Sequence, residues 1–230
     1  MPTSDFTPNV RFIALFFLLI CGMPGCSLMS LEDPEIPKLP ISTESVAQEV
    51  VAKKEPVTSN QSHVYIYFIH GLDPCDYANL RGVEQICHDL GYCNTVYTTM
   101  TQSDEVISHV ECTKARDPQA RIVIYGYSAG ADIARRVTNK LHDRDCIDVD
   151  LLFYVSGIIL IDTKSARPEY VGKIVHILDG GKVIPGMKLS GADNYRFSDV
   201  WHFGTPMHPR TLAILEEELK QQTLLVNSAK

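Results

Sequence analysis

The chain has 230 residues, of which 45% are hydrophobic and 21% are charged. These proportions are typical of a globular protein, and the length suits one substantial domain with additional segments. The formal net charge is −7, and no stretch is rich in Lys and Arg. Because a phosphate backbone is bound by a basic surface, this charge disfavours nucleic-acid binding.

An export signal is predicted at the N-terminus. Arg11 precedes an apolar run at residues 12–21, and Gly25 and Cys26 follow it. The run is shorter than the roughly 20 residues that span a bilayer, and the arrangement is typical of a secretory signal. The Gly-Cys pair resembles the lipobox of bacterial lipoproteins. This resemblance implies a signal peptide over residues 1–25, a lipid on Cys26 that anchors the chain to a membrane, and a place in the cell envelope, on the periplasmic or outer-membrane side. An ordinary cleaved signal and an uncleaved anchor are the alternatives.

The segment 26–61 is predicted to be a flexible tether. It contains four prolines, and its scattered polar residues leave no sustained apolar period. Such a spacer fits a domain held away from a membrane, and it fits equally a plain disordered tail. The folded domain is expected to occupy residues 62–230.

Five cysteines lie within the expected domain. None shows the CxxC spacing of a zinc site, and we expect neither a metal nor an organic cofactor. An exported protein can form disulfides, but small buried side chains with or without one bridge are the simpler interpretation. The five are Cys75, Cys87, Cys93, Cys112 and Cys146.

Strands and helices alternate through the expected domain. Short β-branched or apolar runs predict strands, and apolar residues three or four apart predict helices. The predicted strands cover residues 64–69, 94–99, 122–125, 149–155, 174–178 and 195–200. The predicted helices between and after them cover residues 77–90, 103–116, 131–142 and 211–225. This alternation indicates a doubly wound α/β fold, with a mostly parallel sheet flanked by helices.

The most informative motif is a GxSxG sequence between a predicted strand and a predicted helix. It comprises Gly126, Tyr127, Ser128, Ala129 and Gly130. The chain must turn sharply there, which exposes the serine hydroxyl, and the glycines lack the Cβ atoms that would collide in the turn. The helix that follows directs its positive dipole end at the hydroxyl. We therefore interpret Ser128 as a nucleophile, the alternative being a tight turn with an idle serine.

Residues 63–225 resemble the α/β-hydrolase superfamily, on its lipase and esterase side and in a compact form. The resemblance rests on the GxSxG motif and on His70-Gly71-Leu72 after the first strand. It implies an oxyanion hole formed by the backbone amides of Leu72 and Ala129, each donor being worth roughly 3 kcal/mol. It also implies that His70 is a structural residue.

The general base is expected among four histidines that follow the nucleophile. The family order of nucleophile, acid and base places this histidine in the loop before the final helix, where both His202 and His208 lie. We favour His202, because His208 precedes a proline and is better suited to shape the loop or cap the helix. His142 ends the helix after the nucleophile, and His176 lies inside a strand.

Three aspartates are candidates for the acid that orients the base. Asp162 follows an apolar run and resembles the LIDT ending of several family members. Asp179 follows the strand predicted over 174–178, which is where the family most commonly has its acid, and Asp193 is a third choice. We choose Asp162 and leave the other two open.

The resemblance implies a serine hydrolase that cleaves a small-molecule carboxylic ester or thioester through an acyl-enzyme. A non-catalytic relative that acts as a binding or envelope protein is one alternative. An acyltransferase that uses the same serine and histidine is the other.

Overall fold

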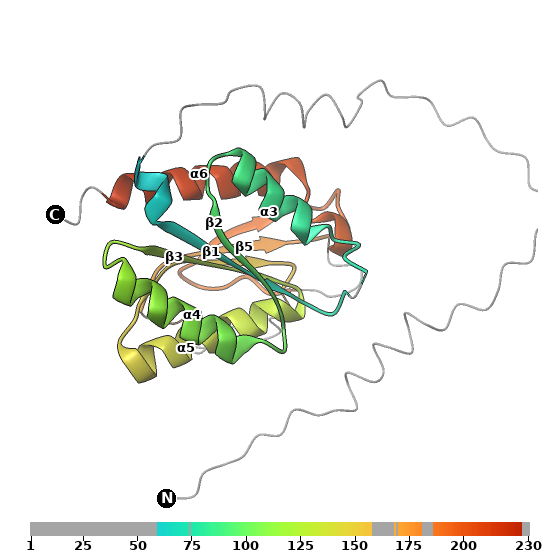
Figure 1. The fold of residues 1–230 in the computed structure, drawn as a ribbon. Helices are drawn as coiled ribbons and strands as arrows, with labels where there is room; N and C mark the ends of the chain where they lie inside the picture. The colour runs from blue at the N-terminus through green and yellow to red at the C-terminus, as the bar shows by residue number, and fades with distance from the viewer. Residues whose placement is uncertain (1–58, 74, 158–167, 169, 181–185, 227–230) are drawn as a thin grey trace, which may run out of the picture. The chain divides into compact units, whose positions relative to one another are not determined.

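Six parallel strands form one sheet in the order β2-β1-β3-β4-β5-β6 (Figure 1). The structure is a computed structural model that describes residues 59–73, 75–157, 168, 170–180 and 186–226. The described residues all fall within one compact unit. The expected segments 1–25 and 26–61, including Cys26, lie outside the described residues apart from the last three positions of the tether.

The elements alternate along the chain as the sequence predicts. They are η1 (Ser59–His63), β1 (Val64–His70), α3 (Leu80–Asp89), β2 (Asn94–Thr99), α4 (Ser103–Arg116), β3 (Arg121–Tyr127), α5 (Ala129–Asp145), β4 (Val149–Val155), β5 (Val171–Leu178), β6 (Asp193–Arg196), η3 (His202–Gly204) and α6 (Pro209–Val226).

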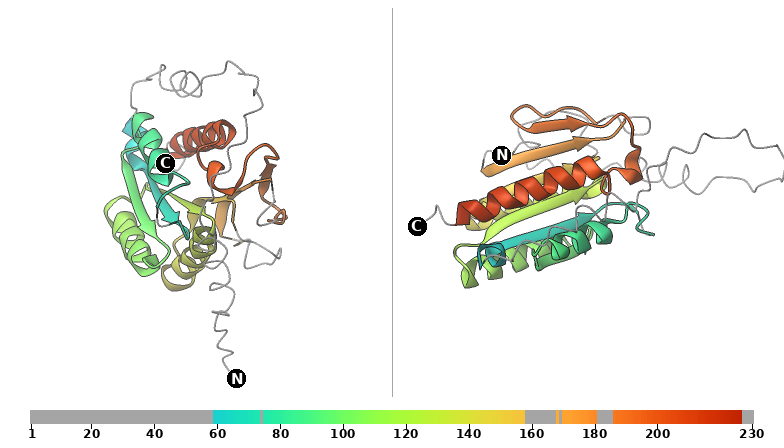
Figure 2. Two further views of the ribbon diagram at one scale, coloured as in Figure 1. Left: turned by 90° about the vertical axis from the view of Figure 1, so that its right-hand side faces the viewer. Right: turned by 90° about the horizontal axis from the view of Figure 1, so that it is seen from above.

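Helices cover both faces of the sheet (Figures 1 and 2). On one face α4 and α5 pack against alternate strand residues such as Tyr67 and Ile69. On the other face α3 and α6 pack against the residues between them, such as Ile66 and Phe68. The central strands are therefore buried on both sides, which explains their continuous apolar sequences. The predicted doubly wound α/β fold is confirmed, with every described strand pair parallel.

Most element boundaries differ from the predicted ones by one to four residues, and two of these differences have a clear physical reason. The helix expected from residue 77 begins at Leu80, because Asn79 has a left-handed backbone (φ 53°) and its side chain caps the amide of Gly82. The last strand ends at Arg196 instead of extending to residue 200. Its neighbour β5 ends at Leu178, and beyond the two strands only the backbone bonds from the Phe197 amide to the Leu178 carbonyl (2.9 Å) and from the Gly180 amide to the Val200 carbonyl (3.1 Å) join the described parts of these segments.

The strand order creates a switch point beside β1. The chain passes from β1 to β2 on one side through α3, and then returns through α4 to β3 on the other side. In sheets of this kind, ligands bind at the carboxyl ends of the strands where the order reverses. A ligand site is therefore expected at the carboxyl ends of β1 and β3. His70-Gly71 lies at the end of β1, and Ser128 directly follows β3.

All five cysteines of the domain are free. Cys87 is buried, as expected of a small apolar side chain, and burial raises the pKa of its thiol to about 12. The other four are exposed, so the expectation of burial was wrong for them. Within the described ranges, no helix combines the length and the apolar character needed to cross a membrane.

Candidate active site

Ser128 occupies a strained turn between β3 and α5. Its backbone lies at φ 55° and ψ −123°, a region that a residue with a Cβ rarely adopts. Such a conformation costs on the order of 1–3 kcal/mol and persists only where its surroundings impose it. Here the amide of Ser128 donates to the carbonyl of Val155 (2.9 Å), which holds the turn against the end of β4.

Two glycines allow the turn to pack directly against the end of β1. A Cβ on Gly130 would collide with the carbonyl of Ile69, and a Cβ on Gly71 would lie 2.7 Å from the carbonyl oxygen of Tyr127. The missing side chains let the backbones touch. This close approach brings the loop that follows His70 beside Ser128.

The side chains of Ser128, His202 and Asp179 form a continuous hydrogen-bonded chain. The Nε2 atom of His202 lies 2.9 Å from the Oγ atom of Ser128, and its Nδ1 atom lies 3.0 Å from the Oδ2 atom of Asp179. All three residues are about 95% buried. With Nδ1 donating to the carboxylate, Nε2 is left to accept the serine proton, which is the arrangement of a nucleophile, a base and an orienting acid.

The backbone around His202 is fixed by a short turn. The carbonyl of Trp201 accepts bonds from the amide of Gly204 and the hydroxyl of Thr205, each at 3.0 Å. The hydroxyl of Tyr127 donates to the carbonyl of His202 (3.4 Å), and their rings lie 5.3 Å apart. Burial and nearby carboxylates raise the pKa of Tyr127 well above its usual value, which keeps this hydroxyl a donor.

The carboxylate that contacts His202 belongs to Asp179, one of the two candidates that the sequence left open. Asp179 follows β5 directly and contacts His202, whereas Asp162 lies outside the described residues. Asp193 pairs with the Nζ atom of Lys173 (3.0 Å) at the start of β6. Of the two described candidates, the structure brings Asp179 to the imidazole.

The remaining histidines after the nucleophile have other surroundings. The ring of His208 is tilted by 35° against that of Phe197 and accepts a bond from the amide of Arg210 (3.3 Å) at the start of α6, as a loop and helix-capping residue would. His142 pairs with Asp148 at the far end of α5. His176 is fully buried in β5, and burial lowers its pKa to about 4.

Two backbone amides beside Ser128 are available to a ligand. Ala129 is the first residue of α5, where a helix leaves its amides without internal partners. Leu72 follows Gly71, whose Cβ position lies 2.9 Å from the amide nitrogen of Ala129. Neither amide donates a hydrogen bond to another described residue. These are the two amides for which the family resemblance implies a place in an oxyanion hole.

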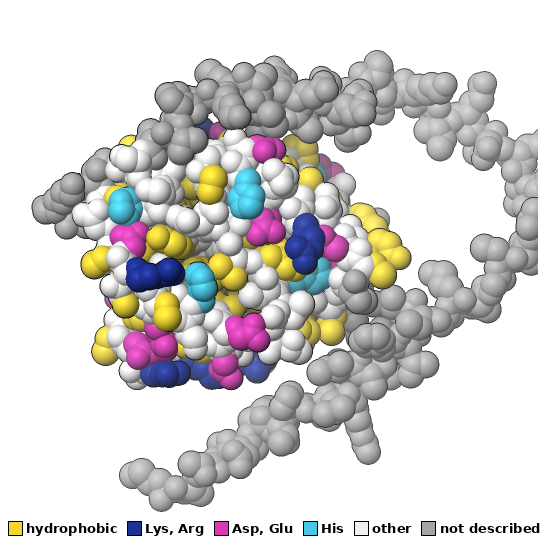
Figure 3. Space-filling model, viewed as in Figure 1, with side chains coloured by type: hydrophobic (Ala, Val, Ile, Leu, Met, Phe, Trp, Pro, Cys, Tyr) yellow, Lys and Arg dark blue, Asp and Glu magenta, His cyan; other side chains and the backbone are white. Residues whose placement is uncertain are grey.

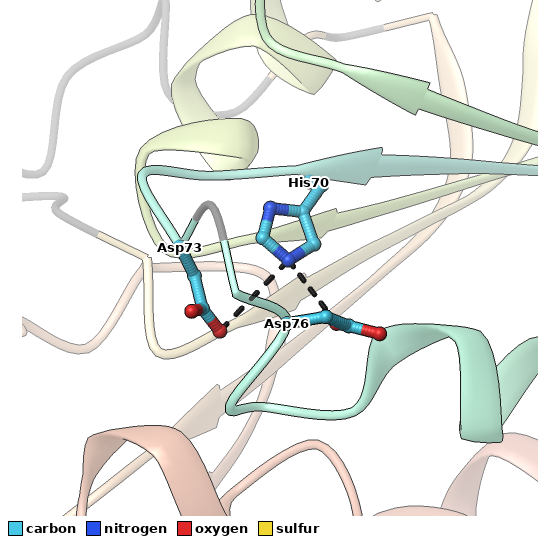
Figure 4. Close-up of side chains that lie close together, drawn as sticks. All are labelled: His70, Asp73 and Asp76. Atoms are coloured by element: carbon cyan, nitrogen blue, oxygen red, sulfur yellow. Dashed lines mark hydrogen bonds and ion pairs between the residues drawn. The ribbon is translucent and has the colours of Figure 1, made fainter.

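A polar cluster holds the loop that carries Leu72 (Figure 4). The Nε2 atom of His70 lies 3.3 Å from Oδ1 of Asp76 and 3.9 Å from Oδ2 of Asp73. The same carboxylate oxygens accept bonds from the amides of Leu80 and Ala78, both at 2.8 Å. The cluster therefore ties the end of β1 to the beginning of α3, and His70 has a structural place in the loop.

This cluster is also the one group in the described ranges whose spacing could hold a metal ion. Both carboxylates accept hydrogen bonds from the start of α3, whereas the Oδ1 atom of Asp73 is buried without a hydrogen-bond partner among the described residues. The roles of Asp73, Asp76 and the Tyr127 hydroxyl were missed from the sequence. The signal for the two aspartates was their position just before a predicted helix, where aspartate commonly caps the first amides of the helix.

Comparisons with known proteins give similarity in structure but none in sequence. No family model matches the chain, and no curated protein matches it. Among solved structures, human thioesterase 2 is similar with 9% identity and a TM-score of 0.47, covering 70% of this chain and 97% of that one. A CIB-like hydrolase from Thermoplasma acidophilum is similar with 14% identity and a TM-score of 0.41, covering 74% of this chain and 89% of that one.

Proposed function

We propose that the protein is a serine hydrolase of the α/β-hydrolase fold that cleaves carboxylic esters or thioesters. The observation that carries this proposal is the buried chain from Ser128 through His202 to Asp179, with contacts of 2.9 and 3.0 Å at the switch point of the sheet. A strained turn, two amides without a partner among the described residues and an oriented imidazole in one place are what acyl transfer requires.

The first half of the reaction forms an acyl-enzyme. The Oγ atom of Ser128 attacks the carbonyl carbon while Nε2 of His202 takes the hydroxyl proton, and Asp179 stabilises the resulting imidazolium. The carbonyl oxygen becomes an oxyanion that accepts bonds from the amides of Leu72 and Ala129. The bond to the alcohol or thiol then breaks, and this leaving group receives the proton from Nε2.

The second half returns the enzyme to its starting state. Water gives a proton to Nε2 of His202 and attacks the acyl carbon, and the same two amides hold the second oxyanion. The bond from carbon to Oγ of Ser128 then breaks, and the serine regains its proton as the acid is released. No step needs a group beyond these side chains and amides.

Labelling with a fluorophosphonate probe tests the proposal directly. We expect one probe per chain, attached to Ser128, because the Oγ–phosphorus bond forms as the phosphorus–fluorine bond breaks, with fluoride leaving and the proton passing to His202. Intact-mass measurement and peptide mapping would read the result. Ser128→Ala is the control and should stay unlabelled. A folded wild-type protein that also stays unlabelled would favour a binding protein on this fold and overturn the proposal.

We further propose that the chain is exported and held at an envelope membrane by a lipid on Cys26. The support is the apolar run at residues 12–21 followed by Gly25 and Cys26. In bacteria fed an alkyne-bearing fatty acid, the wild-type protein and Cys21→Ser should both become labelled and fractionate with membranes, whereas Cys26→Ser should do neither. Equal labelling of Cys26→Ser would rule the lipid site out.

A further inference from the structure

Exposed aromatic side chains border the candidate site. Within the described ranges, five large hydrophobic side chains are exposed, and two of them are the aromatic residues Tyr77 (75%) and Trp201 (63%). Tyr77 lies in the loop between β1 and α3, which also carries Leu72. Trp201 directly precedes His202. The other three are Met187, Leu224 and Leu225.

Phe203 joins the two exposed rings into one surface. Its ring centroid lies 6.2 Å from that of Tyr77 and 5.2 Å from that of Trp201, both in edge-to-face contact. It also lies 5.5 Å from the ring of His202. We call Tyr77, Trp201 and Phe203 the aromatic rim. Figure 3 shows hydrophobic side chains gathered at the edge of the domain toward which the strands point.

The aromatic rim stands on a fixed backbone. Ala78, next to Tyr77, is fully buried and donates its amide to Asp73 (2.8 Å). The carbonyl of Trp201 is held by two hydrogen bonds, and its indole lies near the Cα of Gly204, where an added Cβ would be 3.5 Å away. Phe203 packs at its base against the core on the α3 and α6 face. The rings are thus held in place while much of their apolar surface faces water.

Removing such rings from water lowers the free energy, and in this fold the rings of Tyr77 and Trp201 remain exposed to water. Scattered exposed hydrophobic residues are common and need no explanation. A contiguous aromatic surface shared by the loops that carry the nucleophile's partners is different, because it adjoins the place where the substrate carbonyl must lie. Any substituent of the substrate that extends past His202 meets it.

We propose that the aromatic rim binds an apolar chain of the substrate, so that the preferred esters or thioesters carry a medium or long alkyl chain. This inference rests on the proposed function. The occupant is one chain of a single substrate molecule, because three rings form a small patch and one of them lies 5.5 Å from the ring of His202, beside the reacting serine. The rim therefore sets selectivity for chain length.

Chain-length profiles test the inference. The probes are 4-nitrophenyl esters from acetate to decanoate, which vary the acyl chain, and alkyl acetates from methyl to octyl, which vary the alcohol chain. In at least one series kcat/KM should rise with length in the wild type. The variant Tyr77→Ser/Trp201→Ser should lose about tenfold or more of that preference, since each buried methylene is worth a factor of roughly four. Leu224→Ser removes an equally exposed apolar side chain far from the site and should keep the wild-type profile.

A second measurement does not depend on turnover. Trp201 is the only tryptophan of the chain, so intrinsic tryptophan fluorescence reports on the rim alone. After Ser128 is labelled with a decyl fluorophosphonate, the emission should shift to shorter wavelength and acrylamide should quench it less. Labelling with an ethyl fluorophosphonate should leave both properties near those of the free protein.

The outcomes separate this inference from the proposed function. Suppose that Ser128 is labelled and turnover is measurable, but the length profiles are flat in both series or Tyr77→Ser/Trp201→Ser has no effect. That result would overturn the proposed binding of an alkyl chain by the aromatic rim and would leave the proposed hydrolase activity standing. An unlabelled Ser128 would overturn both. Conservative variants Tyr77→Phe and Trp201→Phe should retain the length preference, because they keep an aromatic ring at each position.

Discussion

Replacement of His202 by alanine is expected to lower kcat for ester hydrolysis by about a millionfold, which is the size of the loss when a serine hydrolase loses its catalytic histidine. Among the described residues, the imidazole of His202 is the one side chain within hydrogen-bond distance of the Ser128 hydroxyl, with its Nε2 atom 2.9 Å from Oγ. Without it the hydroxyl has no acceptor for its proton and is a weak nucleophile. Steady-state kinetics with 4-nitrophenyl esters would measure the loss, and circular dichroism would show that the fold is kept.

His208→Ala is the matched control for this experiment. His208 lies in the same loop, six positions later, but contacts Phe197 and Arg210 and not the serine. We expect its kcat to stay within about threefold of the wild type, with at most a modest loss of stability from the weakened start of α6. If His208→Ala abolished turnover and His202→Ala did not, the base would have to be reassigned.

Replacement of Asp179 by asparagine is expected to lower kcat by about 10⁴-fold with little change in KM. The carboxylate accepts a hydrogen bond from Nδ1 of His202 (3.0 Å), which places the single proton of the neutral ring there. An asparagine amide can donate to Nδ1 instead, which moves the proton to Nε2 and removes the acceptor that Ser128 needs. The ratio of kcat values for wild type and variant is the measurement.

Two further aspartates provide the comparison. Asp193→Asn should retain activity, because Asp193 pairs with Lys173 at the opposite end of β6 from the site. Asp162→Asn should do so as well if Asp179 is the acid. A large loss in Asp162→Asn together with a small loss in Asp179→Asn would return the role to Asp162.

The fold and the sharp turn at Ser128 could be anticipated because their signals are local. The turn at Ser128 needs small neighbours at Gly126 and Gly130, and these occur within five residues between a buried strand and a helix. The base could be ranked because the loop before the last helix is short and holds only two histidines. Such patterns require no knowledge of which distant residues meet.

The acid and the aromatic rim could not be anticipated in the same way. Asp162 and Asp179 both follow apolar runs, and the choice depends on where the end of β5 stands relative to the turn at His202, which is a long-range relation. Tyr77 was placed inside a predicted helix. It is instead in a loop because Asn79 adopts φ 53° and delays the helix start to Leu80.

The course of α6 has a practical consequence. This helix runs from the turn after His202 back across the sheet, and its last residues lie near η1 (Figures 1 and 2). Near its end, Thr223 bonds to Tyr92 (3.2 Å), and Leu90, two residues before Tyr92, accepts a bond from Gln61 of η1 (3.0 Å). Residues 59 and 226 therefore share the edge where the strands begin. A short linker could join them in a circularly permuted protein, and a fusion partner at either position would face away from Ser128.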